Sequence, residues 1–249
     1  SPVLGYNSKD DIVYQFWANR DSHEVYYFDP KTDYAPTTAI SSISWDDPNF
    51  PNIEGFGVWA AKCNFTMGPD GKMYSRMLGG NLVRIDVENA RGENLTNGDL
   101  VGTKDGSAYG LVFDPQDENV FYFSNNDKHC IYKYDLRTKE CACWAGQEGK
   151  SGYLDGPIGQ AMFNKPGQMC VDSEGNIILT DTENHCIRKI TMSTGYVSTL
   201  AGKPQNSGYV NGSAEDAQFK KPLGICIDND DVMYIGDSEN RAIRRLAVE

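Results

Sequence analysis

Histidine is scarce in this chain of 249 residues, and the cysteine spacings of redox and zinc sites are absent. The chain has three His and seven Cys, and the one close pair, Cys141 and Cys143, is separated by one residue instead of two. An odd number of cysteines without such a motif argues against a disulfide framework. No stretch approaches 18 apolar residues, so we expect no membrane insertion by this segment.

Positive charge is also in short supply. The 23 Lys and Arg residues stand against 35 Asp and Glu residues, and the formal net charge is −12. A chain of this charge is not expected to bind nucleic acid or an anionic membrane through its net electrostatic attraction. The sequence contains no G-x-S-x-G elbow and no H-E-x-x-H motif. These absences remove the commonest hydrolase and metalloprotease signatures.

The residues that are present favour strands. Aromatic residues make up 11% of the chain, hydrophobic residues 39%, and the 25 Gly recur in turn clusters between short apolar runs. We find no amphipathic pattern of ten or more residues that would indicate a helix. The apolar content is sufficient for a core, and the fold class that follows is all-β.

The chain repeats itself at a shift of 56 residues. Nine of the 26 positions from 165 to 190 are identical to their counterparts in 221–246. The identical residues are Lys165, Pro166, Cys170, Asp172, Asp181, Glu183, Asn184, Ile187 and Arg188. The same shift carries 151–153 onto 207–209, and weaker copies lie upstream. A tandem repeat of this length indicates a solenoid or propeller.

Five units can be counted, each with the same expected strand pattern. Their approximate bounds are 1–52, 53–105, 106–158, 159–214 and 215–249. In the fourth unit the expected strands are 167–172, 177–181, 186–191 and 196–200. Four short antiparallel strands at a period of roughly 40–56 residues are typical of a β-propeller blade. One blade cannot bury both of its faces, so we expect the units to stack.

The repeat motifs resemble a known family, the NHL-repeat six-bladed β-propellers. The residues that carry this resemblance are Gly152-Tyr153-Leu154-Asp155-Gly156, Ala161-x-Phe163, Lys165-Pro166-Gly167, Asp172-x-x-Gly175-Asn176, Asp181-x-x-Asn184-His185-x-Ile187-Arg188 and Gly195-x-Val197-x-Thr199-Leu200-Ala201-Gly202. The match is good over 106–249 and limited to strand rhythm over 1–105. The fifth unit departs from it at Asp231, where the turn Gly usually stands. The resemblance implies a propeller of four-stranded NHL-type blades, five in this chain and six in the intact ring.

The resemblance also bears on closure and location. The fifth unit has no copy of 197–202, and propellers of this family commonly close with a strand from near the N-terminus. Residues 1–9 look like an inner first strand. We therefore expect a closing strand, a sixth blade and a further domain upstream of Ser1. The Gly-Tyr-x-Asp-Gly insert resembles propellers that follow an Ig-like TIG domain in surface proteins of glycan-degrading Gram-negative bacteria. This likeness implies an extracytoplasmic location, at the cell surface or in the periplasm.

Histidine could in principle hold zinc, since one related propeller enzyme, the amidating lyase, uses three channel His. Here His23, His129 and His185 occupy one repeat position in three different units. Equivalent positions on successive blades are spread around a ring and do not converge. We therefore expect a structural or surface role for these side chains, and no cofactor.

Repeat equivalence also guides the expectations for cysteine and aspartate. Cys130 and Cys186 are equivalent, as are Cys170 and Cys226, and strand positions beside Val or Ile favour buried small hydrophobes over nucleophiles. Asp181 ends a second strand, where we expect it to cap the following loop by accepting backbone N–H bonds.

The binding site is expected on the face that carries the long loops. In an antiparallel blade the loops after strands two and four emerge on one face, and here that face is expected to carry the long segments 45–60, 91–107, 146–165 and 203–220. The candidate ligand-binding residues on that face are Trp45, Arg20, Trp59, Tyr153 and Tyr209. Trp45 ranks first because it has no repeat partner. Trp59 aligns with Phe163 and Phe219, and Tyr153 with Tyr209, so these could equally be packing residues.

Two functions follow. The first is a non-catalytic binding module for a glycan or a protein partner. The alternative is a propeller-type hydrolase or lyase with a divalent metal in the central channel, where the inner strands supply Asn64, Gln168 and Asn7 but no identifiable carboxylate. Because propellers host both kinds of function, the fold alone does not choose between them.

Overall fold

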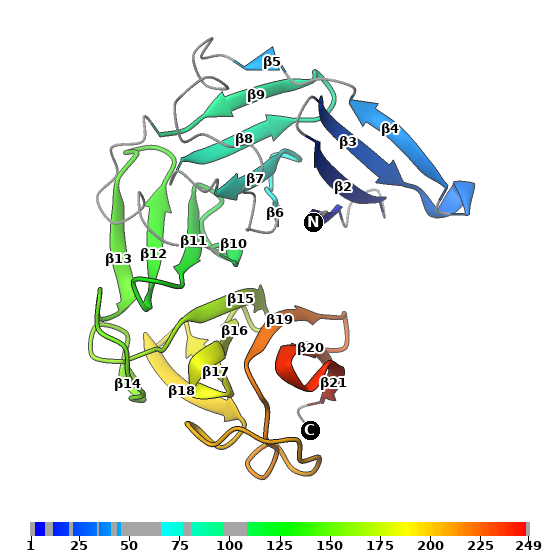
Figure 1. Cartoon of the computed structure of the whole chain (residues 1–249). Coiled ribbons are helices and arrows are strands. Elements are labelled where there is room, and N and C mark those ends of the chain that lie inside the picture. The colour runs from blue at the N-terminus through cyan, green and yellow to red at the C-terminus, as the bar shows by residue number, and fades with distance from the viewer. Residues whose placement is uncertain are drawn as a thin grey trace. The chain divides into compact units, whose positions relative to one another are not determined.

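A computed structural model of the chain describes residues 3–7, 12–19, 22–33, 35–40, 44–45, 66–76, 81–96 and 109–247. Contacts divide the chain into two compact units, Ser1–Ser107 and Ala108–Glu249. Across the described ranges, no helix has the length and apolar character needed to cross a membrane. Figure 1 shows that the described elements are almost all strands.

The second unit contains three consecutive antiparallel sheets (Figure 1). The first comprises β10 (Leu111–Phe113), β11 (Val120–Asn125), β12 (Cys130–Asp135) and β13 (Cys141–Gly146). The second comprises β14 (Gly156–Pro157), β15 (Pro166–Val171), β16 (Ile177–Asp181), β17 (Cys186–Thr191) and β18 (Tyr196–Ala201). The third comprises β19 (Pro222–Ile227), β20 (Met233–Asp237) and β21 (Ala242–Leu246). The predicted strands of this region are confirmed to within a residue or so at their ends.

The first unit contains two sheets. One has the order β1-β2-β3-β4, from β1 (Val3–Asn7), β2 (Ile12–Asn19), β3 (Ser22–Phe28) and β4 (Pro36–Ile40). The other has the order β5-β9-β8-β7-β6, from β5 (Ser44–Trp45), β6 (Thr66–Met67), β7 (Met73–Arg76), β8 (Leu82–Asp86) and β9 (Arg91–Asn94). The pairing of β5 with β9 is parallel, and the remaining pairings in both sheets are antiparallel.

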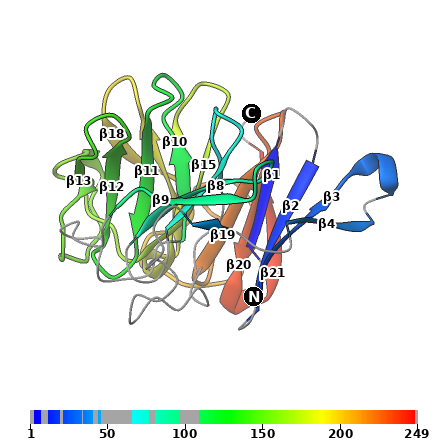
Figure 2. The ribbon, with the colours of Figure 1, turned by 90° about the horizontal axis from the view of Figure 1, so that it is seen from above.

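The blades of the second unit stack through their inner strands. β15 contacts β10 and β11 on one side and β19 on the other, and Figure 2 shows β10, β11, β12 and β13 side by side within one blade. The core lies between blades, where Ile178 and Ile187 of one sheet pack with Ile225 and Met233 of the next and with Phe219 of the intervening loop. Phe163 and Phe219 are buried, which supports the interpretation of this repeat position as core.

In the second unit the short loop after the second strand of a blade lies beside the long segment before that blade, as the blade geometry predicts. After β16, the short 3₁₀ turn η4 (Thr182–Asn184) hydrogen-bonds to the segment 146–165, with Glu183 N donating to Asn164 O at 3.0 Å. The equivalent turn η5 (Ser238–Asn240) bonds to the segment 203–220 through Glu239 N and Lys220 O. The long loops are therefore held firmly against the blade.

Candidate functional site

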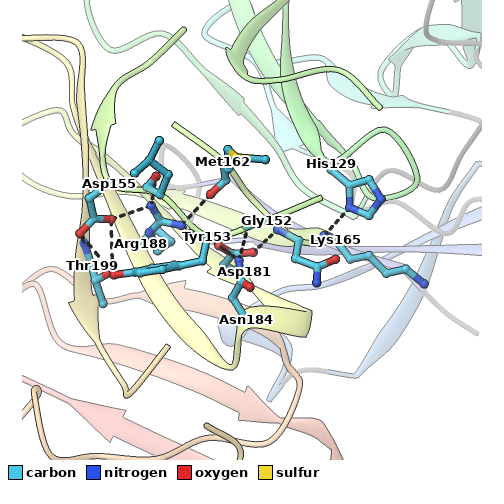
Figure 3. A network of polar contacts seen from close by, with 12 residues as sticks. His129, Gly152, Tyr153, Asp155, Met162, Lys165, Asp181, Asn184, Arg188 and Thr199 are labelled. Atoms are coloured by element: carbon cyan, nitrogen blue, oxygen red, sulfur yellow. Dashed lines mark hydrogen bonds and ion pairs between the residues drawn. The ribbon is translucent and has the colours of Figure 1, made fainter. Parts of the chain in front are cut away.

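A buried arginine organises the loop face of the fourth blade. Arg188 lies in the middle of β17, and its side chain is fully buried. Its Nη1 donates to Asp181 Oδ2 at 2.7 Å and to Met162 O at 3.1 Å. Its Nη2 donates to Asp155 Oδ1 at 2.6 Å and to Leu154 O at 3.0 Å. Figure 3 shows the guanidinium at the centre of these contacts, which attach the segment 146–165 to the blade.

Asp181 has a different role from the one expected. The turn η4 that follows it begins without a side-chain cap. Asp181 accepts a backbone N–H from Asn164 at 2.7 Å, from the preceding long loop, and the Asn184 side-chain amide at 2.8 Å. Burial raises the pKa of Asp181 to about 6, although Arg188 and the donors of Asn184 and Asn164 oppose this shift. The aspartate therefore joins two loops and does not cap its own.

Tyr153, a predicted ligand-binding residue, is part of this network. Its ring lies 4.9 Å from the Arg188 guanidinium carbon, and its hydroxyl is 2.8 Å from Thr199 Oγ1. Asp155 accepts the backbone N–H of Thr199 at 3.2 Å. The ring is half-buried, so its contacts account for it as a packing residue. Whether a ligand also reaches it stays a prediction.

The fifth blade repeats the network with one difference. Arg244 Nη1 donates to Asp237 Oδ2 at 3.0 Å, and the Tyr209 ring lies 5.0 Å from the guanidinium carbon. Tyr209 is nevertheless 59% exposed. The exposed Asn211 stands at the repeat position of Asp155. Tyr209 is one of the five predicted ligand-binding residues. The structure describes its side chain, which is accessible to solvent.

The histidines connect consecutive blades. His129 Nδ1 accepts the backbone N–H of Lys165 at 3.1 Å, and His185 Nδ1 accepts that of Lys221 at 3.2 Å. Both His have φ of 57°, in the left-handed region. Burial lowers the pKa of His129, and the charge of Lys165 adds to this effect. The predicted structural role of these two residues is confirmed, while the side chain of His23 lies outside the described residues.

No group of three or more His, Cys, Asp or Glu that could hold a metal ion occurs in the described ranges. Of the channel positions named above, Gln168 accepts the backbone N–H of Ile225 through Oε1 at 3.0 Å. Asn64 and the side chain of Asn7 lie outside the described residues. The contact of Gln168 attaches β15 to the inner strand of the next blade.

The four repeat cysteines follow the expectation of burial only in part. Cys130 and Cys186 are buried, and burial raises the pKa of the half-buried Cys170 to about 12. Cys226 is exposed, which corrects the expectation that it is a buried hydrophobe. The reason is its position. Cys170 lies in β15, which packs against the inner strand β19 of the next blade. Cys226 lies in β19 itself, which is the last inner strand of the second unit.

A hollow of about 250 Å³ opens between the fourth and fifth blades; we call it the interblade hollow. It is lined by Asp172, Ser173, Glu174, Ile178, Lys189, Leu200, Asp231 and Met233. The two blades meet at its edge, where Ser173 N donates to Asp231 Oδ1 at 2.9 Å. Asp172, Ser173, Glu174 and Asp231 of the lining lie at the turns after β15 and β19, and the other four residues lie in strands β16, β17, β18 and β20.

The interblade hollow combines an apolar floor with a charged rim. Ile178, Leu200 and Met233 supply the apolar side chains. On the rim, Lys189 Nζ lies 2.9 Å from Asp172 Oδ2 and 3.5 Å from Glu174 Oε2. Our sequence reasoning missed this site. The available signal was Asp231, which occupies a turn position that carries Gly175 in the preceding blade and has φ of 58°.

A second hollow, of about 100 Å³, lies in the first unit beside the segment of Trp45. It is lined by Lys72, Arg84, Asp86, Arg91, Gly92 and Glu93. β5 pairs with β9 so that Trp45 lies opposite Gly92. The backbone of Trp45 is thereby placed at this sheet edge, whereas Arg20 and Trp59 lie outside the described residues.

The charges of this second hollow form an alternating lattice. Arg84 lies opposite Glu93, and Asp86 opposite Arg91, on the paired strands β8 and β9. Hydrogen bonding from Asn89 is the main cause of the lowered pKa of Asp86. Residues two apart on a strand share a face, so the spacing Arg-x-Asp and Arg-x-Glu could have revealed the lattice from the sequence.

Comparisons with known proteins agree with this architecture. Residues 163–190 match the NHL repeat. NHL repeat-containing protein 2 of Gallus gallus is 30% identical over 152 residues, which cover 60% of this chain and 19% of that protein. A Bacteroides thetaiotaomicron protein of unknown function has a TM-score of 0.81 at 25% identity, over 99% of this chain and 58% of its own.

An auxiliary nutrient binding protein of the same bacterium has a TM-score of 0.73 at 23% identity, again over 99% of this chain and 58% of its own. The chain therefore spans less than two thirds of the length of these relatives. The repeated four-stranded pattern, the NHL match and the structural likeness agree, and the chain has the fold of an NHL-repeat β-propeller.

Proposed function

We propose that this chain is a non-catalytic, extracytoplasmic binding module whose ligand is a glycan held in the interblade hollow. The observation that carries the proposal is the apolar floor of Ile178, Leu200 and Met233 beneath a charged rim. Small-ligand sites combine apolar walls with a few polar groups that fix orientation. A sugar ring has C–H faces that suit the floor, and hydroxyls that both donate to carboxylates and accept from ammonium groups.

Asp172 and Lys189 on the rim stabilise each other's charged forms. Burial raises the pKa of Asp172, but the Asn176 and Lys189 hydrogen bonds outweigh it and leave the pKa lowered. Burial lowers the pKa of Lys189, but the bonds to Asp172 and Glu174 outweigh that effect and leave it raised. The hollow thus presents a charged acceptor in Asp172 and a charged donor in Lys189, and hydrogen bonds to charged groups are the stronger kind.

The comparison with known proteins supports binding. One structural neighbour is described as an auxiliary nutrient binding protein of Bacteroides thetaiotaomicron. The long-loop face, favoured from the sequence, is the weaker candidate in the described half. There, Arg188 already holds the segment 146–165 and engages the ring of Tyr153.

The test is a glycan screen followed by calorimetric titration. The variant Lys189→Met removes the donor at the rim, and Lys133→Met changes the residue 56 positions earlier in the repeat. We expect Lys189→Met to weaken glycan binding by about tenfold or more, while Lys133→Met leaves it unchanged. Equal affinities for the parent and both variants would place the ligand elsewhere, and the lack of any glycan ligand would favour a protein partner.

The alternative function, a hydrolase or lyase with a divalent metal in the central channel, makes a separate prediction. It requires about one metal ion per chain after purification without chelators. Elemental analysis measures this ratio directly. A stoichiometric divalent metal that EDTA removes would favour the enzyme over the binding module.

A further inference from the structure

Two cysteines face each other in the third blade, which is the sheet of β10 to β13. Cys130 lies in β12 and Cys143 in β13, and both are free thiols. The two thiols hydrogen-bond to each other. At the shift of 56 residues the same two positions hold Cys186 and Thr199, so the fourth blade carries one thiol at this site where the third blade carries two.

A β-bulge explains how the two thiols meet. The ladder pairs Cys130 with Gly146 and Tyr132 with Cys143, and Trp144 is the extra residue of β13 between these pairs. Cys130 and Tyr132 are two residues apart and share a face of the sheet. Because Gly146 has no side chain, the next side chain of β13 on that face is Cys143. Its Sγ lies 3.7 Å from the carbonyl oxygen of Gly146, the residue opposite Cys130.

Gly146 keeps the space between the two cysteines open. It has φ of +91°, and a Cβ there would lie 2.9 Å from the ring of Phe163 and 3.2 Å from the Cα of Cys130. A larger residue is therefore opposed both by the backbone conformation and by these contacts. The two sulfurs accordingly approach each other with no side chain between them, as a disulfide between neighbouring strands requires.

The two thiols differ in reactivity. Cys143 is half-buried, and hydrogen bonds from the Cys130 thiol and the Glu148 backbone N–H lower its pKa, although burial and the Glu148 carboxylate oppose this shift. Cys130 is fully buried, and its hydrogen bond to the Cys143 sulfur, together with burial, raises its pKa. The thiolate is the nucleophile in thiol–disulfide exchange. These differences make Cys143 the attacking cysteine and Cys130 the resolving one.

We propose that Cys143 and Cys130 form a redox-active dithiol that small disulfides oxidise to an internal disulfide. The Cys143 thiolate attacks one sulfur of the small disulfide, which forms a mixed disulfide and releases one small thiolate. The Cys143 sulfur then no longer accepts from Cys130, and the Cys130 thiol transfers its proton to the released thiolate. The Cys130 sulfur attacks that of Cys143 and expels the second small thiolate, which takes a proton from solvent. The protein dithiol is thereby oxidised, and one small disulfide is reduced to two small thiols.

Two other cysteines serve as controls. Cys141 lies opposite Tyr134, one pair further from Cys130 on the same face of the ladder. Cys186, the repeat equivalent of Cys130, is fully buried, and burial raises its pKa well above the ordinary value. Thr199 stands where Cys186 would need a second thiol. We therefore expect neither Cys141 nor Cys186 to take part in the exchange.

The test treats the reduced full chain with glutathione disulfide under native conditions and maps the products by mass spectrometry without reduction. Cleavage after lysine and arginine places Cys130 in the peptide 129–133 and Cys143 in the peptide 140–150. We expect these peptides to become joined at least about tenfold faster than any product forms at Cys186. The bridged chain should melt about 5–10 °C above the reduced chain, because the bridge restricts the unfolded state.

Three variants separate the steps. Cys130→Ala should stop at a mixed disulfide of glutathione with Cys143, Cys143→Ser should form no bridge, and Cys141→Ser should behave like the parent. The proposal would be overturned by a parent without joined peptides, or by a bridge that persists in Cys143→Ser or is lost in Cys141→Ser. It would also be overturned by a Cys130→Ala chain without the mixed disulfide, or by a bridged parent that melts no higher than the reduced one. The dithiol lies outside the interblade hollow, so none of these outcomes depends on glycan binding.

Discussion

Arg188 and Asp181 form an ion pair in which Nη1 lies 2.7 Å from Oδ2 and neither side chain is exposed to solvent. Their β-strands are adjacent, and both residues also hold the long loop 146–165 through Asn164 and Leu154. Breaking a buried pair on one side leaves the other charge uncompensated in a medium of low polarity. Loss of either partner is therefore expected to destabilise the fold.

We expect Arg188→Met to reduce the free energy of unfolding by about 3–5 kcal/mol, because Asp181 then remains buried without its cation. Urea denaturation measures this loss. Arg137→Met is the control, since Arg137 pairs with Asp135 but is 54% exposed, and its denaturation midpoint should stay close to that of the parent. Equal effects for the two variants would mean that the buried network does not hold the loop.

His129 should make stability depend on pH. Burial lowers the pKa of the folded-state imidazole below its ordinary value of about 6.5. The neutral ring accepts the Lys165 N–H, so its contribution is fully present above about pH 6.5 and is lost as pH falls through the folded-state pKa. We expect the parent to lose stability relative to His129→Asn as pH falls below about 6.5, because Asn tolerates the left-handed conformation without titrating.

The comparison with the variant is needed because Asp181 acts in the opposite direction. Its folded-state pKa is raised to about 6, so its contribution is present at low pH and is lost as pH rises through that value. Both proteins contain Asp181, and the difference between their unfolding free energies isolates His129. A difference that does not vary with pH would contradict the assigned role.

Two glycines with positive φ should respond differently to substitution. Gly149 has φ of +75°, and a Cβ added there would meet nothing within 4 Å, so Gly149→Ala should cost about 1–2 kcal/mol from backbone strain alone. At Gly202 a Cβ also meets His185 O at 3.0 Å and Phe219 at 3.1 Å. Gly202→Ala should cost about 1–3 kcal/mol more. Thermal and urea unfolding of both variants measure the two losses of stability. A larger loss for Gly149→Ala than for Gly202→Ala would contradict the prediction.

Trp45 remains the aromatic residue that we predict to stack on a ligand. Its segment is attached to β9 opposite Gly92, beside the charged lattice of Arg84 and Glu93. Trp45 belongs to the first unit and the interblade hollow to the second, so this prediction concerns a separate glycan contact. Trp45→Ala should leave folding nearly unchanged and weaken glycan binding at the Trp45 segment by about 1–3 kcal/mol, by analogy with other aromatic stacking contacts. Calorimetric unfolding and glycan titration of the same variant measure both quantities.

Trp144 provides the contrast, because it packs against the core of the second unit with its ring 4.2 Å from that of Tyr122. Trp144→Ala should lower the melting temperature through loss of packing. A loss of about 3–5 kcal/mol for Trp45→Ala would assign Trp45 to the core instead. Unchanged glycan affinity in that variant would remove it from the binding site.

The amino-acid sequence by itself determined the strands of the second unit and their equivalence. The shift of 56 residues places His129 and His185 at one repeat position, and both adopt the same φ and accept the same backbone bond. This was predictable because similar local sequences with the same turn residues form similar local structure. The same logic identified the positions of Phe163 and Phe219 as candidates for core packing.

Tertiary structure alone decided which groups meet. Ser173 and Asp231 join across two blades although 58 residues separate them, and they border a hollow that no single motif encodes. Asp181 takes its backbone donor from Asn164 in the preceding loop, and Cys226 is exposed where its repeat partner is half-buried. The physical reason is that periodicity specifies the contacts within a blade, whereas burial, ion pairing and hollows depend on which blade lies next to it.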